Sequence, residues 1–203
     1  MKRININNKN NSHFIGSWKM DDDQLMEDLV DFFNKNHESH KQGEISTGAV
    51  DKKKKDCLDL FINPKEAKEK NDTIILTYID KLASCYQDYA EQWDYVKNWK
   101  KIYIGPFVIQ KHLKSGHHKA YHVDRKNISE SHKIFSWVTF LNDVSGNEGK
   151  IHFKYFNLSI KPERGKTLIW PSEWTHAHNE EPTIKSEKYL IKGSFHFPDT
   201  LNE

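Results

Sequence analysis

The stretch that decides the fold opens with YHVD at residues 121–124 and closes with WTHAH at residues 174–178 and, ten residues later, Lys188. Successive side chains of an extended strand point to opposite faces, so His122 and Asp124 project from the same face. One imidazole beside one carboxylate makes two of the three ligands of a facial Fe(II) site, and a histidine from a distant strand completes it. We therefore predict a metal centre that starts from His122 and Asp124.

The third ligand is ambiguous from the residues alone. His176 and His178 share one face if their strand is regular, so both are candidates. A basic residue that follows the triad in the sequence, such as Lys188, could bind an anionic co-substrate that reaches the metal.

The second half of the chain reads as β structure. Turn signals such as Lys114-Ser115-Gly116, Asn142-Asp143 and Glu163-Arg164-Gly165 separate its apolar runs. About eight short strands at this spacing predict a sandwich or jelly roll, the class that includes the cupins. The predicted strands cover residues 102–104, 107–109, 120–123, 134–141, 151–153, 158–160, 167–170 and 188–197.

The first half reads as mainly helical. Apolar residues recur at helical spacing over residues 22–36 and again over residues 72–97, with Asp72 as an N-cap. The predicted fold class is therefore α+β, a double-stranded β-helix with N-terminal helices packed on its sheet. We expect one domain over residues 1–203, divided into a flexible tail (1–12), a helical part (13–100) and a jelly-roll core (101–198).

Composition excludes several classes of protein. The chain of 203 residues is 30% charged but has a net charge of only +2, so no basic surface for nucleic acid is expected. No apolar run is long enough for a membrane span, and the polar start predicts no signal peptide. Two cysteines, Cys57 and Cys85, do not suggest a secreted disulfide framework. We expect a cytoplasmic protein.

The order of motifs points to a family. After the YHVD motif come FLND at residues 140–143, the turn KPERGK at 161–166 and LIWP at 168–171, and then His178 and Lys188. This order resembles the prolyl-4-hydroxylase-like branch of the Fe(II)/2-oxoglutarate dioxygenases, closely over residues 100–197 and loosely before them.

The resemblance implies the roles of the site residues. His122, Asp124 and His178 would bind Fe(II), and Lys188 would pair with the distal carboxylate of 2-oxoglutarate. His178 is preferred over His176 because the family places its basic residue ten positions after the distal histidine. The co-substrates would be 2-oxoglutarate and O2, with ascorbate in support. The presence of Asp124 implies hydroxylation, because the related halogenases lack that carboxylate.

The sequence departs from the family near the co-substrate. His112 stands where prolyl hydroxylases often have a tyrosine, and Phe140 replaces a second tyrosine. His112 is therefore a candidate co-substrate contact. Arg125 could bind a substrate carboxylate, although a surface salt bridge is an equal alternative. The substrate would be a peptidyl proline or a small amino-acid-like molecule, and loops 37–56 and 113–118 are candidate lids.

Two other interpretations stay open. One is a cupin-type metalloprotein of another class, an isomerase or a cofactor-free dioxygenase, although such sites usually add further histidines or a glutamate. The other is a binding module without catalysis that keeps the fold.

Overall fold

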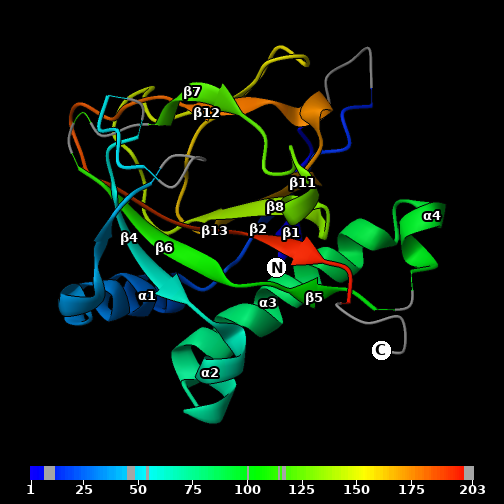
Figure 1. Cartoon of the computed structure of the whole chain (residues 1–203), viewed down its shortest axis with the longest axis horizontal. Coiled ribbons are helices and arrows are strands. Elements are labelled where there is room, and N and C mark those ends of the chain that lie inside the picture. The colour runs from blue at the N-terminus through cyan, green and yellow to red at the C-terminus, as the bar shows by residue number, and fades with distance from the viewer. Residues whose placement is uncertain are drawn as a thin grey trace.

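Two facing β-sheets and a helical layer make up the fold in the computed structural model (Figure 1). The structure describes residues 1–6, 12–44, 49–53, 55–99, 101–113, 115 and 118–198. Its N-terminal elements are β1 (Lys2–Arg3), β2 (Gly16–Lys19), α1 (Asp23–Lys35), η1 (His37–Ser39), β3 (Lys41–Gln42), β4 (Leu58–Ile62), α2 (Pro64–Glu69), α3 (Thr73–Ala90) and α4 (Asp94–Lys97). The C-terminal elements are β5 (Tyr103–Ile104), β6 (Phe107–His112), β7 (His118–His122), η2 (Ile128–Glu130), β8 (Lys133–Phe140), β9 (Ile151–Phe153), β10 (Leu158–Ile160), β11 (Lys166–Pro171), η3 (Trp174–His176), β12 (His178–Glu180) and β13 (Lys188–His196).

The larger sheet has nine strands in the order β1-β2-β11-β8-β13-β6-β4-β3, with β5 also paired to β13. The smaller sheet runs β10-β9-β12-β7 and faces the larger one, as in a double-stranded β-helix (Figure 1). All recorded strand pairs are antiparallel. The predicted jelly roll with helices packed on its sheet is confirmed.

The two faces of the large sheet bury different cores. On β13, Tyr189, Ile191 and Phe195 pack toward the helices, whereas Leu190 packs between the two sheets. This alternation follows from the pleat, which sends successive side chains to opposite faces. Helices α1 and α3 cover the outer face, so the space between the sheets is left for the site (Figure 1).

The predicted N-terminal helices form with the expected caps. The Asp22 side chain accepts from the backbone N–H of Leu25 at the start of α1, and Asp72 accepts from that of Ile75 at the start of α3. The prediction of one helix over residues 72–97 was wrong, because the chain leaves helical geometry after Ala90 and α4 restarts at Asp94. Extended backbone at Trp93 separates the two helices.

The N-terminal part is also less purely helical, and its tail less loose, than predicted. Strand β1, inside the predicted flexible tail, pairs with β2 at the sheet edge, where Arg3 forms an ion pair with Asp88 of α3. Strands β2, β3 and β4 extend the same large sheet that β6, β8 and β13 build. Parts of the tail (7–11) and of the two candidate lids (45–48, 54, 114, 116 and 117) lie outside the described residues.

Candidate metal centre

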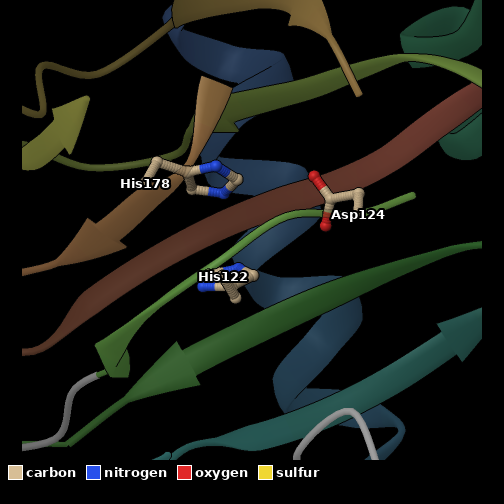
Figure 2. Close-up of side chains that lie close together, drawn as sticks. All are labelled: His122, Asp124 and His178. Carbon is tan, nitrogen blue, oxygen red and sulfur yellow. The ribbon is translucent and has the colours of Figure 1, made fainter. Parts of the chain in front are cut away.

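The three predicted ligands meet between the two sheets. Strand β12 pairs with the end of β7 so that His178 lies opposite His122, and their ring centroids are 4.4 Å apart. Asp124 follows two residues after the end of β7. One ligand atom from each of the three side chains lies within 4.8 Å of the other two, and Figure 2 shows the side chains around one common space.

Two details of local structure differ from the prediction. Strand β7 ends at His122, so Asp124 reaches the site from the following loop rather than from the same strand. His176 belongs to the turn η3 and β12 begins only at His178, so the two histidines do not share a strand face. This turn separates the two candidates for the third ligand, and His178 is the one beside His122 and Asp124.

Hydrogen bonds orient each ligand. His122 Nδ1 lies 3.2 Å from the carbonyl of Ala120, and His178 Nδ1 lies 3.0 Å from that of His176. A carbonyl oxygen only accepts, so each Nδ1 carries the proton and each Nε2 carries the lone pair that a metal needs. The hydroxyl of Ser136 donates to Asp124 Oδ2 at 2.5 Å and lies 2.9 Å from the hydroxyl of Ser172.

The charge states suit a divalent metal. Burial, and next the neighbouring His178, lowers the pKa of His122 from 6.5 to about 3. Burial acts to raise the pKa of Asp124, but the two imidazoles and the Ser136 hydroxyl outweigh it and lower that pKa. At neutral pH, Asp124 is therefore an ionised carboxylate and His122 a neutral imidazole, which are the forms that bind metal. Among the described residues, no second cluster of His, Cys, Asp or Glu has metal-binding geometry.

A cavity of about 390 Å³ opens beside the three ligands. Its apolar wall excludes water from part of the space, and its polar wall carries several ionisable groups. The apolar wall consists of Phe61, Pro106, Phe107, Val108, Trp137, Val138, Ile151 and Trp170. The polar wall consists of His122, Asp124, His132, Lys133, His178, Glu180, Lys192, Ser194 and His196.

Lys188 lies deeper than the wall of this cavity. Its side chain is fully buried, and Nζ lies 2.8 Å from Glu180 Oε2 and 3.5 Å from the carbonyl of Gly149. Strand pairing places it opposite His112 of β6. Lys188 is not among the residues that line the cavity with the triad. Its predicted contact with a co-substrate stays a prediction.

His112 lies in the same buried polar region. Its Nε2 is 3.4 Å from Gln110 Oε1 and 3.7 Å from Glu180 Oε2, and its Nδ1 has no hydrogen-bond partner within the described part of the chain. Burial, and next the charge of Lys188, lowers the pKa of His112 well below its ordinary value. His112 is therefore a neutral imidazole, and its predicted contact with the co-substrate also stays a prediction.

The two remaining candidates lie outside the cavity wall. Arg125 forms an ion pair with Glu173 and donates to the carbonyl of Ser131 at 3.3 Å, which is the salt-bridge alternative for this residue. His176 is buried, with Nε2 2.8 Å from the carbonyl of His13 and Nδ1 2.9 Å from the Thr175 hydroxyl. It supports the site through its own carbonyl, which binds His178.

Sequence reasoning missed five ionisable residues of the cavity wall, namely His132, Lys133, Glu180, Lys192 and His196, and two of these carried a signal in the sequence. Glu180 follows His178 by two positions on β12, and Lys192 follows Lys188 by four positions on β13. Residues two or four positions apart on a strand lie on the same face, so Glu180 shares a face with His178 and Lys192 shares one with Lys188. The sequence therefore contained a signal for both residues. Burial acts to lower the pKa of Lys192, but Glu180 and other anionic neighbours outweigh it and raise that pKa.

Comparison with known proteins agrees with this geometry. The family model described as the 2OG-Fe(II) oxygenase superfamily matches residues 107–196, which contain the whole triad. No curated protein matches the sequence. Among the described residues, no helix is both long and apolar enough to cross a membrane.

Several solved structures share the fold. A prolyl-4-hydroxylase of Pseudomonas putida has a TM-score of 0.68 at 14% identity, covering 92% of this chain and 94% of its own. The viral collagen prolyl hydroxylase of Paramecium bursaria Chlorella virus-1, in its 2-oxoglutarate complex, has a TM-score of 0.66 at 12% identity, with coverage of 91% and 97%. A prolyl hydroxylase of Trichoplax adhaerens, bound to a peptide fragment of hypoxia inducible factor, has a TM-score of 0.70 at 13% identity, with coverage of 91% and 84%.

These findings confirm the predicted resemblance, the predicted enzyme class and its co-substrates. The family implies Fe(II), 2-oxoglutarate and O2, and the described donors of two imidazoles and one carboxylate fit such an ion. Residues 107–196 match the model of the 2OG-Fe(II) oxygenase superfamily, and the chain has the fold of the prolyl 4-hydroxylases.

Proposed function

We propose that the enzyme hydroxylates a C–H bond of a peptide or a small amino-acid-like molecule. One O2 is consumed, 2-oxoglutarate loses CO2 to become succinate, and the substrate gains the hydroxyl. The observation that carries this proposal is the pairing of β12 with β7, which brings His178 opposite His122 with Asp124 close to both.

The protein's own residues have distinct tasks in this proposal. His122, Asp124 and His178 hold the iron, which with 2-oxoglutarate supplies the oxidising chemistry when both are bound. Ser136 fixes one oxygen of Asp124, and the carbonyl groups of Ala120 and His176 fix the imidazole tautomers. An ammonium group of β13, predicted to be that of Lys188, holds the distal carboxylate. The apolar wall keeps water from the reacting atoms.

The substrate class rests on the cavity and on one relative. The cavity of about 390 Å³ suits a single residue or a small molecule rather than a large cofactor. The Trichoplax enzyme is in complex with a peptide, which favours a peptide among the candidates. A reducing, cytoplasmic setting fits Cys57 and Cys85, because both are buried free thiols.

Turnover of labelled 2-oxoglutarate tests the proposal. Purified protein is incubated in air with Fe(II), ascorbate and labelled 2-oxoglutarate, with and without proline-containing peptides and free amino acids. We expect succinate to form above the level of His122→Ala and to rise with a true substrate. Succinate at the variant's level in every mixture, together with no binding of 2-oxoglutarate, would refute the oxygenase function. Metal binding without either result would favour a cupin of another class.

A further inference from the structure

A second group of polar side chains lines the cavity beside the metal ligands. Its members, here called the His132 cluster, are His132, Lys133, Ser194 and His196. The rings of His132 and His196 have centroids 4.5 Å apart, and the Ser194 hydroxyl lies 2.9 Å from His196 Nε2. The carbonyl of His132 accepts from the backbone N–H of Phe197 at 3.1 Å. These contacts join the start of β8 to the end of β13, so the cluster has a fixed structure.

A β-bulge turns Lys133 toward the cavity. Ile134 and Phe135 both pack in the core on the helix side of the sheet, although neighbouring strand residues normally point to opposite faces. The pairing with β13 gives the cause, because Phe135 lies opposite Phe195 whereas Lys133 lies opposite His196, which leaves Ile134 as an extra residue. The extra residue shifts the alternation by one. Lys133 therefore takes the inner face of the sheet, which strict alternation would have given to Ile134.

Strand register places the His132 cluster near the metal ligands. Ser194 lies opposite Ser136, whose hydroxyl donates to Asp124. His196 is two residues further along β13, which is about 7 Å of extended chain. A small molecule in the cavity can therefore reach the metal at one end and the His132 cluster at the other.

Lys133 is the less committed of the two lysines in the cavity wall. The other, Lys192, donates to Glu180 at 3.3 Å. The Lys133 ammonium lies 3.8 Å from Glu130, too far for a hydrogen bond, and Glu130 accepts from the backbone N–H of Lys126 at 3.2 Å. Within the part of the chain that the structure describes, the Lys133 ammonium has no hydrogen-bond partner, although its side chain is only 28% exposed. A partly buried ammonium in this state favours an anionic ligand that supplies the missing acceptor.

We propose that Lys133 binds the carboxylate of an amino-acid substrate, with the imidazole of His132 beside it as a second donor. This inference rests on the proposed function and narrows its substrate to a free amino acid or the C-terminal residue of a peptide. With its carboxylate at the His132 cluster, the same residue extends its side chain toward the metal. An internal residue of a peptide has a neutral amide in that place and offers Lys133 no charge.

The test compares acids with their amides. Calorimetry on protein loaded with Mn(II) and 2-oxoglutarate gives the Kd of each of the common amino acids, of its C-terminal amide and of its N-acetylated form. We expect at least one acid to bind about tenfold to hundredfold more tightly than its amide, as a charge-assisted hydrogen bond allows. Lys133→Met abolishes this preference, and Lys133→Arg retains most of it. The N-acetylated acid distinguishes the two sources of the carboxylate, because it binds like the free acid only if the site accepts the C-terminal residue of a peptide.

Controls separate this contact from general damage. Lys126→Met removes the same charge from an exposed position seven residues earlier, outside the cavity wall, and leaves the preference for the acid unchanged. The Kd values for Mn(II) and for 2-oxoglutarate report an intact metal centre in each variant. If Lys133→Met fails to bind Mn(II), Lys133→Gln, which keeps a polar end without the charge, takes its place.

Three results would contradict the proposal. If wild type binds no acid more tightly than its amide, the substrate carboxylate is not recognised and the proposal is overturned, while the oxygenase function stands. A preference that persists in Lys133→Met shows that another group binds the carboxylate and overturns the role of Lys133. Failure of Mn(II)-loaded wild type to bind 2-oxoglutarate removes the oxygenase function, and this inference with it.

Discussion

Ser136→Ala removes the hydroxyl that holds Asp124 in place. Ser136 is buried on β8 and donates to Asp124 Oδ2 at 2.5 Å. Its hydroxyl also lies 2.9 Å from the hydroxyl of Ser172, so Ser136 links Ser172 to that carboxylate. A hydrogen bond to a charged acceptor contributes about 1.5–3 kcal/mol, which corresponds to roughly a tenfold to hundredfold change in an equilibrium constant. Loss of a partner that orients a metal ligand typically weakens metal binding by about the same factor.

We therefore expect the Kd for Mn(II), measured by calorimetry, to rise by about tenfold to hundredfold in Ser136→Ala. Ser172→Ala, which removes only the outer hydroxyl, raises it less. Ser17→Ala is the matched control, because Ser17 is a buried serine of the same sheet whose hydroxyl has no partner within the described residues. A Kd in Ser136→Ala equal to that of the control would refute the view that this hydroxyl orients the ligand.

Three further predictions follow from the site and its supports. His178→Ala abolishes tight Mn(II) binding, whereas His176→Asn keeps it, and calorimetry showing the reverse would exchange their roles. Burial lowers the pKa of His176 from 6.5 to about 4, so below pH 6.5 the unfolded chain takes up a proton that the folded chain refuses. The metal-free protein therefore loses about 2 kcal/mol between pH 7 and pH 5 from this residue. Urea unfolding measures the loss, and an undiminished decline in His176→Asn would contradict it. Gly165→Ala destabilises more than Gly146→Ala in the same assay, because both have positive φ but only at Gly165 would a Cβ lie 2.5 Å from a backbone oxygen, that of Met20. Equal losses in the two variants would show that the clash relaxes at no cost.

The sequence alone determined much of the fold and the ligand set. Periodicity and capping residues located α1 and α3, and apolar runs between turn signals located most strands of the jelly roll. The ligands His122 and Asp124 were recognisable because a metal needs particular donors at short spacing. These features depend on near neighbours in the chain, which is why one sequence is enough to find them.

Tertiary structure decided which of several equivalent residues reach the site. His176 and His178 are equivalent candidates for the third ligand in the sequence. The turn η3 distinguishes them, because it directs His176 toward the carbonyl of His13. Lys188 and Lys192 share one face of β13 by the same alternation. Only the register of β13 against its neighbours, and the ion pair with Glu180 from the other sheet, decides which ammonium lies at the cavity wall. Register and contacts between sheets join residues that are distant in the chain, so local sequence patterns do not encode them.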